Sequence, residues 1–186
     1  FGDGSESEAS NPAHNYEADG TYTITLIATN ACGSDTTTQE ITILLPPVAS
    51  WEQNAIEGCE GLSVQFNAAP QGSGLTYAWT FEGGEPATSD LPDPTVLYPI
   101  SGNYSVQLIV TNAAGADTIT QDDAIVVGPN PLAAFAANAI LGQASVQFDN
   151  ASIAASNFHW HFGDGSESEA SNPAHNYEAD GTYTIT

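Results

Sequence analysis

The chain has 186 residues, with 23 Asp and Glu, no Lys or Arg, and a formal net charge of −23. This composition excludes nucleic-acid binding through phosphate contacts, phosphate loops of the GxxxxGK type and lysine-based chemistry, all of which need cationic side chains. No apolar run of about 18 residues occurs, so membrane insertion is not expected, although apolar residues make up 41% of the sequence and can fill folded cores.

Short β-strands are the elements that the sequence predicts. Residues 21–29 alternate apolar side chains with threonines in a period of two, which is typical of a strand with one buried face. The same alternation recurs at 104–110, and the segment around Trp160 is also predicted to be a strand. The segments 63–66 and 77–81 match 145–148 and 158–162 as copies of one another. Clusters of Gly, Pro, Asn and Asp separate these segments, and no stretch has a sustained helical period. The predicted fold class is therefore all-β, built from β-sandwiches.

Two nested repeats indicate the domain organisation. Residues 1–25 recur without change at 162–186, an offset of 162 − 1 = 161 residues, which predicts a tandem 161-residue unit. A diverged repeat within that unit aligns residues 16–38 with 98–120. We expect two alternating domains, which are called A and B below. Residues 1–46 are the C-terminal half of a domain B, residues 47–128 a complete domain A, and residues 129–186 the N-terminal part of the next domain B.

The motifs of domain B resemble those of the PKD domain, an immunoglobulin-like sandwich. The pattern is W-x-F-G-D-G, then N-P-x-H-x-Y, then G-T-Y-x-x-x-L-x-x-x-N-x-x-G-S-D-T. Its residues here are Trp160, Phe162 to Gly165, Asn172, Pro173, His175, Tyr177, Gly181 and Tyr183, continued in the other copy by Leu26, Asn30, Gly33, Ser34, Asp35 and Thr36. Domain A departs from the pattern, with FEGG at 81–84 and DPTVLY at 93–98. The resemblance implies tandem immunoglobulin-like sandwiches arranged as beads along a fibre, outside the cell or on its surface.

Strand alternation assigns the aromatic and histidine residues to opposite faces. The residues expected in the core are Trp79, Trp160, Phe81, Phe162, Tyr22 and Tyr104. His159 and His161 flank Trp160 and are predicted to be exposed strand residues, because the sequence places no third ligand beside them and two are too few for a metal site. His14 and its copy His175 are expected to pack against the neighbouring tyrosine.

An acidic loop occurs twice and carries the weak candidates for a calcium site. Three carboxylates fall within six residues of each copy, and flexible oxygen-rich loops suit Ca²⁺. The candidates are Asp3, Glu6 and Glu8 in one copy and Asp164, Glu167 and Glu169 in the other. A solvated acidic turn, in which Asp164 fixes the bend between two glycines, is the simpler interpretation. No catalytic residue and no other cofactor is expected, since the chain has no GxSxG elbow.

The two cysteines suggest a disulfide between repeats. Cys32 lies in a turn of domain B, and Cys59 lies in a turn of domain A that is two residues longer than its counterpart. In an immunoglobulin-like sandwich these two turns lie at opposite ends of a domain, so stacked domains would separate Cys32 from Cys59 of the same chain. We therefore hypothesise that Cys59 pairs with the Cys32 of the following repeat.

These observations favour a non-catalytic structural repeat of a giant extracellular filament, stalk or surface scaffold. Its expected partners are neighbouring copies of the same repeat, assembled laterally or helically. The alternative is an adhesive or carbohydrate-binding module, which would need a line of exposed aromatic side chains.

Overall fold

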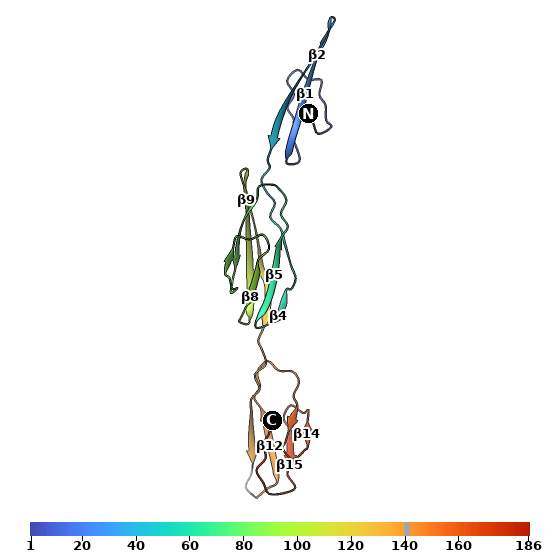
Figure 1. Ribbon diagram of the computed structural model, residues 1–186. Helices are drawn as coiled ribbons and strands as arrows, with labels where there is room; N and C mark the ends of the chain where they lie inside the picture. Colours follow the sequence, from blue (N-terminus) through green and yellow to red (C-terminus); the bar gives the residue numbers. More distant parts are fainter. Residues whose placement is uncertain (140–141) are drawn as a thin grey trace. The chain divides into compact units, whose positions relative to one another are not determined.

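The computed structural model describes residues 1–139 and 142–186, whose regular elements are all β-strands (Figure 1). It divides into two compact units, Phe1–Gly128 and Pro129–Thr186. The strands of the first unit are β1 (Gly20–Asn30), β2 (Gly33–Ile43), β3 (Trp51–Gln53), β4 (Glu57–Cys59), β5 (Leu62–Ala68), β6 (Thr76–Phe81), β7 (Thr88–Ser89), β8 (Thr95–Tyr98), β9 (Gly102–Asn112) and β10 (Gly115–Gly128). Those of the second are β11 (Phe135–Ala139), β12 (Ser145–Asn150), β13 (Trp160–His161), β14 (Glu167–Ser168) and β15 (Ala174–Asn176).

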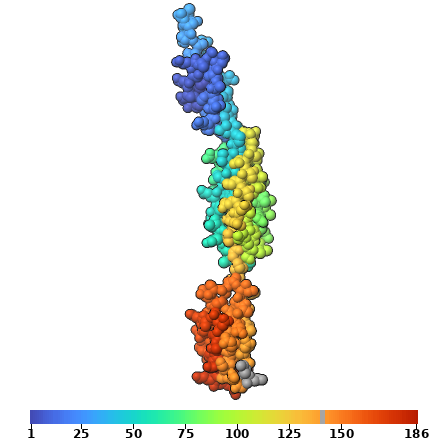
Figure 2. Space-filling model, turned by 180° about the vertical axis from the view of Figure 1, so that it is seen from behind, coloured from blue at the N-terminus to red at the C-terminus, as the bar shows by residue number. Residues whose placement is uncertain are grey.

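Domain A is a two-sheet sandwich. One sheet has the strand order β4-β10-β9-β6-β7 and the other the order β3-β5-β8. The pairing of β4 with β10 is parallel, whereas the other pairings in the two sheets are antiparallel. This parallel pair brings the beginning of the domain against its end, and Figure 2 shows these cyan and yellow parts of the chain side by side on one face.

The core of domain A confirms the period of two. Along β9, Val106, Leu108 and Val110 are each at most 1% exposed, and the residues between them are less buried. Trp79 and Phe81 of β6 pack in the same cluster, and the indole N–H of Trp79 donates to the carbonyl of Leu91 at 2.9 Å. A buried tryptophan therefore also fixes the loop that follows β7, because its one polar atom needs a partner.

The β1–β2 hairpin follows the predicted pattern only in its first half. Its strands pair with each other over their whole length, from Gly20–Ile43 to Asn30–Gly33. Leu26, however, is 62% exposed, whereas Leu108, its counterpart in domain A, is fully buried. Alternation does not bury Leu26 here, because the described residues supply only a two-stranded sheet for this C-terminal half of a domain B, with no second sheet opposite it.

The second unit repeats the first part of the domain A sandwich. Its sheets are β11-β12-β15 and β13-β14, which correspond to β3-β5-β8 and β6-β7. Phe148, Trp160 and Phe162 form its core, and the indole N–H of Trp160 donates to the carbonyl of Ala170 at 2.8 Å. The two tryptophans thus close equivalent loops in the two domains.

The tyrosine that ends the NPAHNY segment of domain B and the DPTVLY segment of domain A forms different hydrogen bonds in the two domains. In domain B, the Tyr177 hydroxyl donates to the carbonyl of Phe162 at 3.0 Å. In domain A, the equivalent carbonyl of Phe81 instead accepts the N–H of Gly84 at 3.3 Å. The hydroxyl of Tyr98, the counterpart of Tyr177, is consequently buried without a hydrogen-bond partner among the described residues, and burial raises its pKa to about 12.

We expect Tyr98→Phe and Tyr177→Phe to have different effects on stability. Tyr98→Phe removes a buried hydroxyl that makes no hydrogen bond, so the free energy of unfolding should stay the same or increase. Tyr177→Phe removes a hydrogen bond and should cost about 1 kcal/mol. Urea unfolding of the two variants measures the difference, and an equal loss in both would show that Tyr98 has a partner in solution.

Candidate functional site

Asp164, Ser166 and His175 form a polar network at the turn that follows β13. The Ser166 hydroxyl donates to Asp164 Oδ1 at 2.5 Å, and the Ser166 backbone N–H donates to the same oxygen at 3.0 Å. Nε2 of His175 lies 2.7 Å from Asp164 Oδ2 and 3.2 Å from Ser166 Oγ. Both carboxylate oxygens of Asp164 are thus occupied by donors from this chain, and the turn between β13 and β14 is fixed by them.

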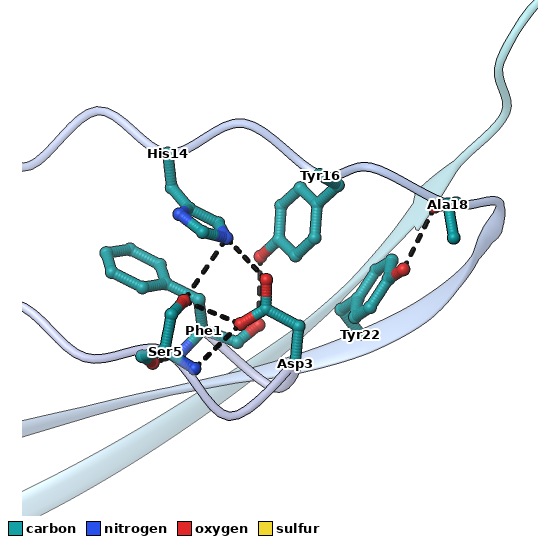
Figure 3. Close-up of polar contacts among 7 residues, drawn as sticks. All are labelled: Phe1, Asp3, Ser5, His14, Tyr16, Ala18 and Tyr22. Atoms are coloured by element: carbon teal, nitrogen blue, oxygen red, sulfur yellow. Dashed lines mark hydrogen bonds and ion pairs between the residues drawn. The ribbon is translucent and has the colours of Figure 1, made fainter.

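The same network recurs at the start of the chain, where Figure 3 shows it around Asp3. Asp3 Oδ1 accepts the Ser5 hydroxyl at 2.6 Å, and Asp3 Oδ2 lies 2.6 Å from His14 Nε2. Tyr16 donates to the carbonyl of Phe1 at 2.9 Å, as Tyr177 does to Phe162. Identical sequences therefore adopt the same local structure in two different units.

A row of stacked rings surrounds each network. The ring of His175 stacks on Phe162 with centroids 4.3 Å apart and meets Tyr177 edge-on at 4.6 Å. Tyr177 in turn stacks on Tyr183 at 4.1 Å, and the Tyr183 hydroxyl donates to the carbonyl of Ala179. The sequence predicted the packing of His175 against tyrosine, but it did not predict the contact with Asp164.

Hydrogen bonding stabilises the ionised form of the two aspartates. The hydroxyl of Ser166, then His175, then the backbone N–H of Ser166 lower the pKa of Asp164 well below its ordinary value of 3.8. The pKa of Asp3 is lowered in the same direction, mainly by the hydroxyl and backbone N–H of Ser5. Each carboxylate therefore stays charged at pH values just below 3.8, where an unpartnered Asp would be mostly protonated.

The network contains Asp, His and Ser, but its geometry does not suit nucleophilic catalysis. In a catalytic triad the carboxylate holds Nδ1–H of the imidazole, and Nε2 accepts the serine proton. Here Asp164 and Ser166 both contact Nε2 of His175, and the serine hydroxyl donates to the carboxylate. Because an ionised carboxylate can only accept, Nε2 carries the shared proton and has no lone pair for Ser166. The arrangement is a structural clamp.

Domain A closes the same turn without this network. The counterparts of Asp164 and His175 are Gly83 and Val96, and Val96 is fully buried. A Cβ at Gly84 would lie 2.5 Å from Val96 Cγ1, so the valine side chain packs directly against the Gly84 backbone and leaves no room for a side chain there. The Asp and His are either both present or both absent in the two diverged domains. That joint change was the sequence signal that could have revealed their contact.

A second polar cluster joins the hairpin to domain A within the first unit. The N–H of Leu45 donates to Asp19 Oδ1 at 2.7 Å, and the carbonyl of Leu45 accepts Asn112 Nδ2 at 2.8 Å. Ser73 donates to Asp19 Oδ2 at 2.9 Å, so Asp19 contacts both the linker and domain A. The hydrogen bond from the Leu45 N–H, followed by that from the Ser73 hydroxyl, lowers the pKa of Asp19. We call Asp19, Leu45, Ser73 and Asn112 the junction clamp.

The other residues singled out from the sequence lie as follows. Trp79, Trp160, Phe81 and Phe162 are buried, whereas Tyr22 and Tyr104 are half-buried, with hydroxyls that donate to carbonyls four residues earlier, those of Ala18 and Ile100. Cys32 and Cys59 are exposed free thiols. The calcium candidates Glu6, Glu8, Glu167 and Glu169 are exposed. Among the described residues, the acidic loops do not gather three carboxylates at one point. Within residues 1–139 and 142–186, the one group of three potential metal ligands consists of Glu167 with His159 and His161.

Comparison with known proteins identifies the family. A profile of the PKD domain matches residues 1–45, 44–127 and 129–186, which together span the chain. The chain belongs to the PKD domain family. The resemblance seen in the WHFGDG and NPAHNY motifs is thus confirmed, and PKD domains are themselves non-catalytic modules.

Two curated relatives carry a similar segment. The chain is 34% identical over 96 residues to the pre-pro-metalloprotease PrtV from two strains of Vibrio cholerae serotype O1. The match covers 52% of this chain but only 10% of those proteins. Among solved structures, a three-domain segment of titin, I67–I69 in an E-to-A variant, aligns with 90% of this chain and 62% of its own, at 14% identity and a TM-score of 0.39. None of the described residues forms a helix that could span a bilayer.

The lowered pKa values of Asp3 and Asp164 predict acid sensitivity. A carboxyl whose folded pKa lies below its unfolded pKa stabilises the fold above the unfolded value, and this contribution disappears as pH falls toward the folded value. The stability of Asp3→Asn/Asp164→Asn should therefore fall less than that of the unmodified chain when the pH is lowered from 5 to about 2.5.

The matched control is Asp35→Asn/Asp180→Asn, which makes the same change in charge at exposed carboxylates outside both networks. Urea unfolding midpoints at each pH provide the comparison. If the two double variants responded to acid alike, general charge repulsion would explain the effect and the networks would not.

Proposed function

We propose that this chain is a non-catalytic segment of a secreted or surface-attached protein, in which the 161-residue pair of PKD domains repeats as an extended scaffold. The unchanged recurrence of residues 1–25 at 162–186 supports tandem repetition. Its extracellular location is supported by the PKD family and by the relatives, which are named as a pre-pro-metalloprotease. The protease activity in that name is not transferred, since the similarity covers 10% of those proteins.

The junction clamp is the observation that carries a mechanical function. The Leu45 peptide is held from both sides, by Asp19 of the hairpin and Asn112 of domain A. Pro46 and Pro47 follow it, and proline restricts backbone rotation at the linker. Pro46 also packs near Gly115, in the β9–β10 turn. A linker held by polar contacts on both sides transmits orientation from one domain to the next, which suits a stalk better than a flexible tether.

A carbohydrate-binding or adhesive module has less support. Such modules grip flat sugar rings with exposed aromatic side chains. The tryptophans and tyrosines of the described residues are buried or half-buried, and Trp51 packs edge-on against Trp79 with centroids 5.7 Å apart. The burial of these aromatic side chains therefore favours the scaffold function over a carbohydrate-binding or adhesive function.

The native cysteines allow a direct test of the junction clamp. Cys32 and Cys59 are exposed and lie on opposite sides of Leu45 in the chain, so a spin label on each reports the distance between the hairpin and domain A. We expect a narrow distance distribution in the unmodified chain and a distribution about twice as broad in Asp19→Ala/Asn112→Ala, because the linker then loses its hydrogen bonds on both sides.

Asp35→Ala serves as the control, since it removes an exposed aspartate of β2 that lies outside the clamp. Its distribution should match that of the unmodified chain. A distribution that is equally broad in all three proteins would contradict a rigid junction and favour a flexible tether.

We also propose that Cys59 forms a disulfide with the Cys32 of the following repeat. Cys59 pairs with Gly128, so it lies beside the last residue before the next domain. The domain A counterpart of Cys32 is Ala114, which precedes Gly115 in the turn next to the incoming linker. By this analogy, the cysteine of the following domain B also lies beside its incoming linker, so that one linker has a thiol on each side. Extracellular conditions allow such a bond to persist.

Alkylation mapping of the tandem protein, isolated under oxidising conditions, tests this pairing. We expect peptides containing Cys59 and Cys32 to be linked before reduction and to separate after it. Quantitative alkylation of both thiols without a reductant would contradict the proposal.

A further inference from the structure

Two histidines and a glutamate converge on the outer face of β13 and β14. His161 Nδ1 lies 3.0 Å from one carboxylate oxygen of Glu167, and His159 Nε2 lies 3.4 Å from the other. One potential ligand atom from each of the three residues lies within 4.8 Å of the other two. The sequence alone places no third metal ligand beside His159 and His161. The structure supplies one in Glu167.

The backbone imposes this convergence. His161 and Glu167 are direct cross-strand partners in the β13–β14 pair, so their side chains leave the sheet on the same face. His159 lies two residues before His161 and shares that face, while Trp160 between them points into the core. The Asp164 network fixes the turn that brings β14 back beside β13. The three side chains are therefore held together by strand register and by a fixed turn.

We propose that His159, His161 and Glu167 form a binding site for one Zn²⁺ ion. Two imidazole nitrogens and one carboxylate oxygen form a ligand set that zinc accepts in proteins. Ligand atoms about 2.0–2.1 Å from a tetrahedral zinc ion lie about 3.3 Å apart. The two histidine nitrogens lie 3.0 and 3.4 Å from different oxygens of Glu167, and one ligand atom from each of the three residues lies within 4.8 Å of the other two, so the side chains must draw together to bind one ion.

The ligand set also favours zinc binding over calcium binding. Calcium takes six to eight oxygen ligands, and this cluster offers the two oxygens of Glu167. The three side chains are each about half exposed, at 50%, 51% and 54%, so the fourth position of a zinc ion faces solvent and can hold water. The site is thus an open one on the surface of domain B.

The chain contains its own control for this site. The acidic loop GSESEAS occurs at residues 4–10 and again at 165–171, so Glu6 is the copy of Glu167. The segment that carries His159 and His161 occurs once. Domain A has Ala78 and Thr80 at the histidine positions. A site made by histidines and Glu167 therefore binds one zinc ion per chain, whereas a site made by the acidic loop alone binds two.

Calorimetric titration of the 186-residue chain with ZnCl₂ tests the proposal, after the chain is freed of metal with a chelator and Cys32 and Cys59 are alkylated. We expect one equivalent to bind, and the thermal unfolding temperature to rise with zinc, because the ion bridges two strands of the folded state. Glu167→Gln and His161→Asn should each weaken binding at least about tenfold, since loss of even an outer-shell partner costs that much. Glu6→Gln should leave binding unchanged.

Excess CaCl₂ should not displace the ion, and Co²⁺ in place of Zn²⁺ should give the visible absorption of a tetrahedral site. Unfolding in the presence of chelator shows that each variant remains folded, as expected for half-exposed side chains. The proposal would be overturned if two equivalents of zinc bound per chain and Glu6→Gln and Glu167→Gln each removed one of them. It would also be overturned if no zinc bound at millimolar concentration, or if none of the variants weakened zinc binding.

Discussion

In a chain with 23 Asp and Glu and no Lys or Arg, the turns and the linker depend on a few aspartates that accept hydrogen bonds from backbone, serine and histidine donors. Every ion pair among the described residues joins a carboxylate to a histidine. Other carboxylates accept from backbone N–H groups, as Asp19 does from Leu45 and Asp117 does from Ala49. These aspartates therefore act as fixed acceptors that hold turns and linkers. Serine hydroxyls donate to Asp164 and Asp19, and histidines lie against Asp164 and Glu167.

The two domains show alternative solutions to the same turn. Domain B uses a charged acceptor with serine and histidine donors, and domain A uses a glycine turn under a buried valine. The polar solution leaves the Phe162 carbonyl free for Tyr177, whereas the apolar one leaves the Tyr98 hydroxyl without a partner in the part of the chain that the structure describes. Both cores contain the same aromatic trio, Phe66, Trp79 and Phe81 in domain A and Phe148, Trp160 and Phe162 in domain B, whereas only domain B carries histidines on the outer face.

Much of the fold could be predicted from the sequence. The period of two identified Val106, Leu108 and Val110 as core residues, and the motifs identified the PKD family. The exposure of Leu26 agrees with the predicted division of the chain, because residues 1–46 supply only the C-terminal half of a domain B and no second sheet lies opposite β1 and β2 among the described residues. The cluster around Glu167 was missed. Its ligands come from two strands, and their approach depends on the register of a turn that the loop sequence alone does not specify.

We propose that tandem PKD pairs form an extended scaffold with rigid junctions. Electron microscopy of the native protein, combined with denaturing gels run with and without reductant, tests it most directly. We expect long, regular filaments or stalks made of very large chains, with a domain repeat along their length. Discrete particles with the mass of a single 186-residue chain would contradict it and would favour a binding module.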